Sequence, residues 1–165
     1  QTHPLLRAAR AGRRHRAVTA AAPRGAGTPE VLHLHIDGGS RGNPGDAGFG
    51  VYVQAKGGAV TELYGYLGRA TNNVAEYQAL LHALRHALAR GARTVRLFSD
   101  SELVVRQMAG EYKVKHPDMI PLHREASSLV RRFERATLSH VRRERNRDAD
   151  RLANQALDER ASKLE

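Results

Sequence analysis

The sequence predicts an α/β fold, with one mixed five-stranded sheet and helices packed on it. Two observations predict it. Residues 31–67 hold three short runs of alternating apolar and polar residues separated by glycine-rich turns, which is typical of an antiparallel meander. After residue 72 the apolar spacing becomes helical, and two short apolar strands interrupt the helices. Because 165 residues with 41% hydrophobic content fill one core, we expect a single domain over residues 30–160.

The three strands of the meander are expected at Val31–Asp37, Ala47–Gln54 and Ala59–Leu67. Gly38–Asp46 (GGSRGNPGD) is expected to be a turn, because glycine and proline favour turns. Lys56-Gly57-Gly58 is expected to close the hairpin between the second and third strands.

Helices are expected at Asn73–Arg90, Ser101–Ala109, Asp118–Glu134 and Asp148–Arg160, and the last two strands at Thr94–Ser99 and Ala136–Arg142. Gly91 is a C-terminal stop for the first helix, and Pro121 is tolerated in the first turn of the third. Right-handed crossovers make strands four and five parallel to strand one and place strand four beside it.

Residues 1–29 differ in composition from the rest of the chain. They contain no acidic or aromatic residue and carry +6 of the net charge of +10, through Arg7, Arg10, Arg13, Arg14, Arg16 and Arg24. Such a segment cannot bury enough apolar surface to fold, so we expect a disordered basic tail. Four interpretations remain open. The tail is a passive extension, or an arm that binds nucleic acid, or an organelle transit peptide, although it lacks Ser. A secretory signal, whose apolar core would be Ala17–Ala22, is the least favoured. Residues 161–165 are expected to form a C-terminal tail.

Composition restricts the class of protein. With no Cys, disulfides and thiolate metal sites are excluded. No run approaches ~18 apolar residues, so we expect no membrane span, and we expect a cytoplasmic monomer. The basic net charge favours a polyanionic partner such as nucleic acid.

Four carboxylates are expected to converge at one edge of the sheet. Asp37 and Asp100 end two neighbouring parallel strands, and Glu76 and Asp150 lie in the first turns of two helices. Because like charges held together require a cation and carboxylates prefer hard ions, we expect Mg²⁺, with Mn²⁺ as a substitute. Two such ions ~3.5–4 Å apart support in-line phosphoryl displacement.

Each carboxylate also has a purely structural interpretation, and taken singly that interpretation is favoured. Asp37 could open a turn, and Glu76 could complete a capping box with Asn73. Asp100 could cap a helix, and Asp150 could pair with a neighbouring arginine, Arg147 or Arg151. The joint convergence of all four favours the metal site.

Four motifs, spread over residues 31–158, resemble in order those of type 1 ribonuclease H. They are Asp37-Gly-Gly-Ser-Arg-Gly-Asn-Pro-Gly45, Thr71-Asn-Asn-Val-Ala-Glu76, Phe98-Ser-Asp-Ser101 and Asn146-Arg-Asp-Ala-Asp150-Arg-Leu-Ala-Asn154. The first motif, Asp-Gly-Gly-Ser, is similar to that of a bacterial and archaeal subgroup of this family. The resemblance implies the ribonuclease H-like sheet with strand order 3-2-1-4-5. It also implies an endoribonuclease that cuts the RNA strand of RNA/DNA hybrids with two metal ions, leaving 5′-phosphate and 3′-hydroxyl ends.

The resemblance also implies roles for individual residues. Asp37, Glu76, Asp100 and Asp150 match the metal-binding carboxylates. Asn43, Asn72 and Asn73 match readers of the hybrid's minor groove, and Arg69 and Thr71 match a pocket for a DNA-strand phosphate. Other substrate contacts are expected within the motifs at Gly38, Gly39, Ser101 and Asn146.

The sequence departs from well-known members of that family in three places. No His lies in the loop before the last helix, where Arg143 or Arg145 could substitute, and His140 comes too early. Glu102 stands where other members have Gln. No Trp-containing basic protrusion is present, and only Lys113-Val-Lys-His116 lies in that region.

Three alternatives compete with the nuclease. The first is a zinc hydrolase, because His33-Leu-His35-Ile-Asp37 begins like the motif of such enzymes, although Gly38 stands where that motif has its next His. His82 and His86 also lie four residues apart on a predicted helix, a spacing that can bind a metal. A catalytically silent hybrid-binding module would keep the fold without the reaction. A relative in the wider superfamily, such as a transposase, a Holliday-junction resolvase or the terminal domain of a reverse transcriptase, would not be expected to combine these motifs.

Overall fold

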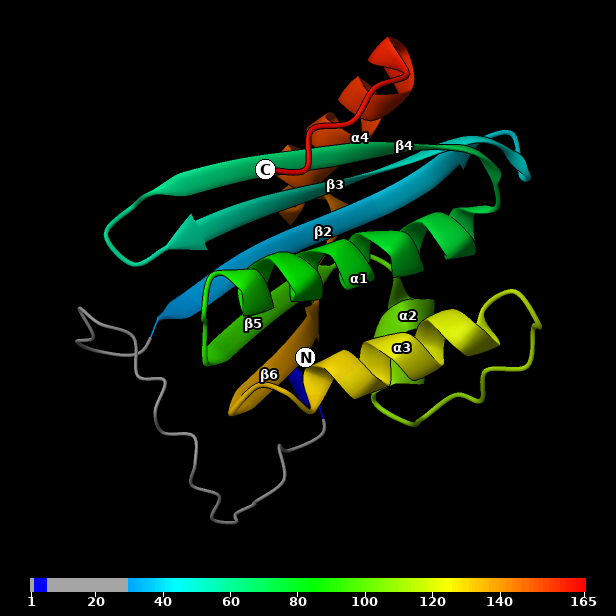
Figure 1. The fold of residues 1–165 in the computed structure, drawn as a ribbon. Coiled ribbons are helices and arrows are strands. Elements are labelled where there is room, and N and C mark those ends of the chain that lie inside the picture. Colours follow the sequence, from blue (N-terminus) through cyan, green and yellow to red (C-terminus); the bar gives the residue numbers. More distant parts are fainter. Residues whose placement is uncertain (1, 6–29) are drawn as a thin grey trace.

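The computed structural model describes residues 2–5 and 30–165, and a mixed sheet of six strands divides its helices into two layers (Figure 1). The strands are β1 (Thr2–Pro4), β2 (Val31–Arg41), β3 (Gly45–Ala55), β4 (Val60–Ala70), β5 (Thr94–Ser99) and β6 (Arg135–His140). The helices are α1 (Asn72–Ala89), α2 (Glu102–Met108), α3 (Ile120–Val130) and α4 (Arg147–Glu159), with a 3-10 turn η2 at Arg143–Arg145. In Figure 1, α1, α2 and α3 lie in front of the sheet and α4 lies behind it.

The predicted strand order is confirmed. The sheet runs β1-β6-β5-β2-β3-β4, in which β4-β3-β2-β5-β6 is the expected order 3-2-1-4-5. Strands β5 and β6 are parallel to β2, as the crossover rule predicted. The sixth strand was not predicted: β1 pairs antiparallel with the outer edge of β6. Residues 6–29, most of the predicted basic tail, lie outside the described residues.

The expected turn at residues 38–46 was placed too broadly. Residues 38–41 continue β2 and pair with β3, so the turn contains only residues 42–44, and Gly42 has the positive φ of 92°. Glycine at position 38 serves close packing, because a Cβ there would lie 2.2 Å from the carbonyl oxygen of Ala75. Composition alone does not separate a turn glycine from a packing glycine.

Helix boundaries differ slightly from the predicted ones. Thr71 caps α1, because its Oγ1 accepts a hydrogen bond from the Val74 N–H at 3.2 Å. Asn73 is therefore already inside the helix, and the alternative interpretation of Glu76 as part of a capping box with Asn73 is wrong. Pro121 lies in the first turn of α3, as expected. That helix is shorter than predicted, since residues 118–119 and 131–134 are not α-helical.

The core lies between the sheet and α1. In β2, Leu32, Leu34 and Ile36 are fully buried, whereas the alternating residues on the opposite face are partly exposed. Leu80 and Leu84 of α1 are fully buried in the same core. No helix within residues 2–5 and 30–165 is both long and apolar enough to cross a membrane.

Candidate active site

Three carboxylates meet at one edge of the sheet. One oxygen each from Asp37, Glu76 and Asp100 lies within 4.8 Å of the others. The parallel pairing of β2 and β5 ends at the pair Ile36 and Ser99. Asp37 directly follows the first of these residues and Asp100 directly follows the second, so the two aspartates lie side by side. Glu76 comes from the start of α1, which packs on β2. The predicted convergence therefore holds for these three residues.

The glutamate is fixed by the backbone of β2. The Gly38 N–H donates a hydrogen bond to Glu76 Oε1 at 3.1 Å. The absent Cβ of Gly38 lets the backbone of α1 approach at Ala75, one residue before the glutamate. One glycine thus provides both the space and the hydrogen bond that orient this carboxylate.

Asn146 fixes the aspartate of β5. Its side chain is fully buried, and Nδ2 donates to the Ile36 carbonyl at 2.9 Å and to Asp100 Oδ2 at 3.3 Å. Ser99 Oγ, also buried, accepts the N–H of Ser101 at 3.0 Å and shapes the backbone turn that follows β5. Sequence reasoning named Asn146 only as a substrate contact and missed a role for Ser99, although this serine directly precedes Asp100.

Electrostatics show that the cluster lacks positive charge. Burial, then the charges of Asp100 and Asp150, raise the pKa of Asp37 to about 8. Burial, then Asp37 and Asp100, raise the pKa of Glu76 well above its ordinary value, and the nearby charge of Arg143 opposes this rise. Carboxylate oxygens gathered in this way suit a hard divalent cation, so the residues fit a metal ion.

The fourth predicted carboxylate lies at the border of this group. Asp150 is exposed in the first turn of α4, near enough to influence Asp37 but outside the set within 4.8 Å. Its helix sits tightly on β3, since a Cβ at Gly50, the strand partner of Asp37, would lie 2.4 Å from the Ala149 carbonyl. Asp150 thus reaches the cluster from the opposite side of the sheet to α1.

The comparisons with known proteins agree with this geometry. A family model described as "Reverse transcriptase-like" matches residues 35–156. Ribonuclease HI of Halobacterium salinarum is 43% identical over 129 residues, covering 78% of this chain and 65% of that protein. The crystal structure of RNase H1 from the same halophilic archaeon has a TM-score of 0.75 at 40% identity and covers 78% of this chain and 98% of that chain. The chain belongs to the type 1 ribonuclease H family.

Two further members of this ribonuclease H family are similar over the same region. The bifunctional protein Rv2228c of Mycobacterium tuberculosis is 47% identical over 127 residues, covering 76% of this chain and 35% of that protein. This chain therefore spans about a third of the length of that mycobacterial relative. The structure of LC11-RNase H1 in complex with RNA/DNA hybrid has a TM-score of 0.73 at 38% identity and covers 78% of this chain and 98% of that chain.

The first two ribonuclease H motifs meet beside the carboxylates. Asn43 Oδ1 accepts the Asn72 N–H at 3.1 Å. Asn72 Oδ1 in turn accepts the Ser40 N–H at 2.7 Å and the Ser40 hydroxyl at 3.2 Å. Gly39 lies against the same amide, with its ideal Cβ position 3.6 Å from Asn72 Oδ1. Sequence reasoning quoted Ser40 within a motif but gave it no role.

The remaining predicted substrate contacts are more scattered. Arg69 is exposed near the end of β4, opposite Asp46 in the register. Thr71 and Ser101 use their hydroxyls as helix caps, the latter accepting the Val104 N–H at 3.2 Å. Asn73 is partly exposed in the first turn of α1. Their roles toward a substrate stay predictions.

The histidines noted in the sequence do not join the carboxylate cluster. Among the described residues, the one group of His, Cys, Asp or Glu with metal-binding spacing is the carboxylate trio. His35 stacks on Phe98, with centroids 4.7 Å apart, and His82 stacks on Phe49 at 4.3 Å. Packing therefore accounts for these rings better than a zinc site does. Of the two loop arginines, Arg143 is the one that influences Glu76.

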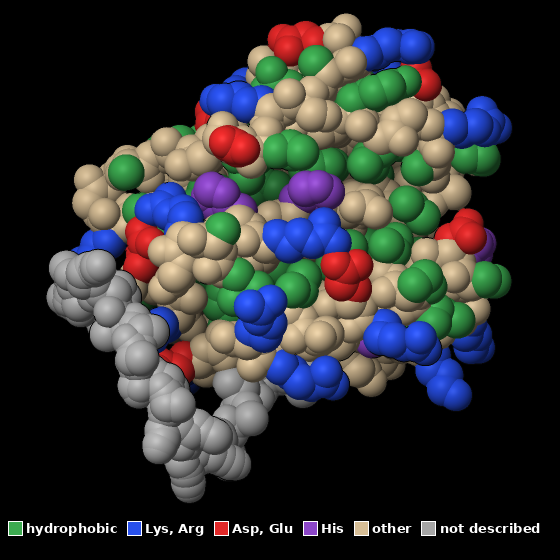
Figure 2. Space-filling model, viewed as in Figure 1, with side chains coloured by type: hydrophobic (Ala, Val, Ile, Leu, Met, Phe, Trp, Pro, Cys, Tyr) green, Lys and Arg blue, Asp and Glu red, His purple; other side chains and the backbone are tan. Residues whose placement is uncertain are grey.

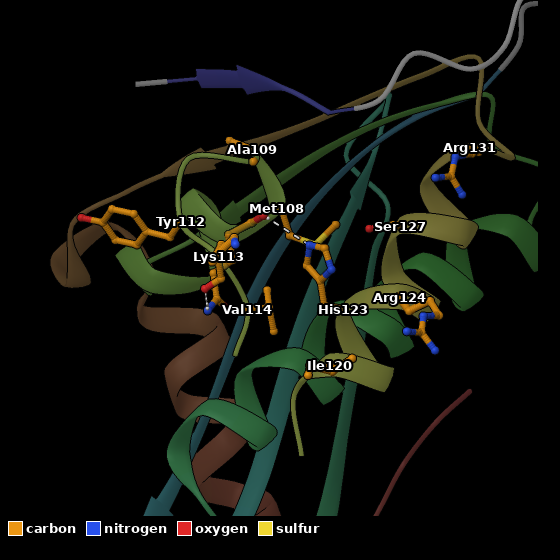
Figure 3. A pocket seen from close by; sticks show the side chains of 12 residues that line it. Met108, Ala109, Tyr112, Lys113, Val114, Ile120, His123, Arg124, Ser127 and Arg131 are labelled. Carbon is orange, nitrogen blue, oxygen red and sulfur yellow. Dashed lines mark hydrogen bonds between the residues drawn. The ribbon is translucent and has the colours of Figure 1, made fainter. Parts of the chain in front are cut away.

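A cavity of about 570 Å³ lies between α2, the segment after it and α3 (Figure 3). Figure 3 shows Tyr112 at one end and, at the other, Arg124 of α3 and Arg131 just after it, with His123 between them. His123 Nε2 lies 3.3 Å from the Gln107 carbonyl. No carboxylate lines this cavity, so it is separate from the carboxylate cluster. The cavity belongs to the face in Figure 2, over which lysine and arginine side chains are spread.

Proposed function

We propose that this chain is an endoribonuclease that hydrolyses the RNA strand of RNA/DNA hybrids and leaves 5′-phosphate and 3′-hydroxyl ends. The observation that carries the proposal is the trio Asp37, Glu76 and Asp100, whose oxygens lie within 4.8 Å of one another. The trio lies beside the amides of Asn43 and Asn72, in a chain of the ribonuclease H family. A relative's complex with RNA/DNA hybrid supports this substrate.

The three clustered carboxylates would hold Mg²⁺, and Asp150 would complete the set from α4. When bound, a pair of Mg²⁺ ions supplies an activated water and stabilises the leaving oxygen. The protein's part is to hold the carboxylates against their mutual repulsion, through Gly38 for Glu76 and Asn146 for Asp100. Mn²⁺ has the same oxygen preference and is the expected substitute.

The two asparagines supply donors suited to the minor groove of a hybrid. The carbonyl oxygens of both side chains accept hydrogen bonds from the protein, which leaves their Nδ2 groups as the available donors. The minor groove of a hybrid presents acceptors on base edges and the 2′-hydroxyls of the RNA strand. Arg69 is exposed and cationic, so it can contact a phosphate of the DNA strand, with Thr71 beside it.

The test is a cleavage assay with end-labelled RNA/DNA hybrid, RNA duplex and DNA duplex, each in Mg²⁺, Mn²⁺ or EDTA. We expect cleavage of RNA in the hybrid alone, lost in EDTA and in Asp37→Asn. Asp118→Asn, which removes an exposed carboxylate outside the cluster, is the matched control and should cleave like the parent. Hybrid binding with no cleavage in either metal would make the chain a silent binding module.

A further inference from the structure

We infer that the open face of the sheet over β5 and β6 binds single-stranded nucleic acid. Val95, Leu97, Ala136 and Leu138 face the core with α1. The alternating residues therefore face the other side of the sheet, where α4 packs on β2, β3 and β4. These residues are Thr94, Arg96 and Phe98 of β5 and Arg135, Thr137 and Ser139 of β6.

These six side chains, with Thr2 of β1, line a cavity of about 370 Å³. The parallel register places Thr94 opposite Arg135, Arg96 opposite Thr137, and Phe98 opposite Ser139. Strand β1 extends this face, and Ser139 Oγ donates a hydrogen bond to Thr2 Oγ1 at 2.8 Å. The cavity is thus a groove across three strands, lined by hydroxyls, two guanidinium groups and one aromatic ring.

The charge of the groove selects an anion. Arg96 and Arg135 are exposed, and neither forms an ion pair with any residue in the described parts of the chain. No carboxylate lines the groove. Guanidinium groups bind phosphate oxygens with charge-assisted hydrogen bonds, and hydroxyls can add further ones.

Aromatic rings continue the groove toward β2. Phe98 stacks on His35, with centroids 4.7 Å apart and an interplanar angle of 21°, and more loosely on His33 at 6.2 Å and 12°. A row of rings beside cationic groups is the arrangement on which unpaired bases stack while phosphates are held.

Single-stranded nucleic acid combines both features, whereas a duplex hides its base faces within its stack. The chain's own Arg-rich residues 6–29 do not complement the groove, since they carry six arginines and no acidic residue. An acidic peptide would match the arginines but leave the aromatic row without a partner. This inference concerns a surface other than the carboxylate cluster and stands independently of the proposed cleavage.

The test measures fluorescence anisotropy of labelled 12-mers of dT and U with the full chain in EDTA, which prevents metal-dependent cutting. The variant is Arg96→Glu with Arg135→Glu. The control is Arg124→Glu with Arg131→Glu, which makes the same change in net charge on α3, on the other face. We expect the first pair to weaken binding by about tenfold or more, and the control pair by much less.

A second variant tests stacking separately from charge. Phe98→Leu keeps an apolar side chain but removes the ring, so affinity should fall roughly fivefold or more, and Phe98→Tyr should restore it. Circular dichroism and melting temperature confirm that each variant is folded. Three outcomes would each overturn the inference. They are an equal loss of affinity in both charge-reversal pairs, no effect of Phe98→Leu on affinity, and mononucleotides that bind as tightly as the 12-mers. A parent chain that binds neither 12-mer, as expected if its own residues covered the groove, would also overturn it.

Discussion

The backbone N–H of Gly38 donates a hydrogen bond to Glu76 Oε1 at 3.1 Å, at a point where the backbones of α1 and β2 are in close contact. A Cβ at Gly38 would lie 2.2 Å from the Ala75 carbonyl oxygen and 2.6 Å from the Glu76 nitrogen. The close packing of α1 on the sheet and the orientation of Glu76, a proposed metal ligand, therefore depend on the same residue.

Gly38→Ala is therefore expected to lower the free energy of unfolding by several kcal/mol, because backbone on both sides of the contact must move apart. Urea unfolding in EDTA measures the change. Gly39→Ala is the matched control, since a Cβ there meets only Asn72 Oδ1 at 3.6 Å, an ordinary contact. Equal losses of stability in the two variants would show that the close approach at Gly38 is not what constrains this position.

Much of this arrangement could be predicted from the sequence, because it depends on where strands end. Asp37 and Asp100 follow apolar strand segments, and a right-handed crossover makes those strands neighbours. Glu76 and Asp150 were expected near them from helix starts, yet only Glu76 belongs to the compact trio. Local sequence does not encode this difference, because α1 and α4 both sit tightly on the sheet, at Gly38 and at Gly50.

Other features depend on contacts between distant segments. The edge strand Thr2–Pro4 pairs with β6 across more than 130 residues, and nothing in its three residues identifies that partner. The continuation of β2 beyond Asp37 was hidden by glycines that also favour turns. The buried link from Asn146 to Ile36 and Asp100 spans 110 and 46 positions, so its motif was visible in the sequence but its contacts were not.

Removal of this buried amide is the second prediction. Asn146→Ala leaves the Ile36 carbonyl without its side-chain donor and should lower the free energy of unfolding by ~1–3 kcal/mol. It should also weaken Mg²⁺ binding, because Asp100 loses the donor to its Oδ2. Chemical unfolding and Mg²⁺ titration calorimetry measure the two effects. Asn154→Ala, an exposed amide on α4, should change stability by less than half as much; a comparable loss there would contradict the assignment.

The third prediction concerns pH in the absence of metal. Asp37 has a folded-state pKa of about 8 against an ordinary 3.8, so between these values the folded protein holds a proton that the unfolded chain has released. Stability in EDTA should therefore fall as pH rises from about 4 through 8, by ~1.4 kcal/mol per pH unit for each extra proton held. Asp37→Asn should flatten this slope, and Mg²⁺ should reduce the loss at high pH. Urea unfolding curves recorded from pH 5 to 8.5 measure how the free energy of unfolding depends on pH. A free energy of unfolding that rises with pH across this range would contradict the raised pKa of Asp37.

The loop arginines give a fourth prediction. The charge of Arg143 holds the pKa of Glu76 below the value that burial and its acidic neighbours would otherwise set. Arg143→Ala should therefore raise the pKa of Glu76 further, as measured by carboxyl ¹³C NMR in EDTA. Arg145→Ala removes the same charge two residues away and should leave that pKa nearly unchanged. If both variants shift the pKa of Glu76 equally, that pKa responds to the net charge of the loop, and the prediction that the position of Arg143 matters is wrong.

The most direct measurement is an anomalous difference map from crystals of this chain soaked in Mn²⁺. We expect a strong Mn²⁺ peak within coordination distance of oxygens from Asp37, Glu76 and Asp100, and no such peak in crystals of Asp37→Asn. A map with no peak among these three carboxylates at saturating Mn²⁺, or with the three side chains turned away from one another, would contradict it.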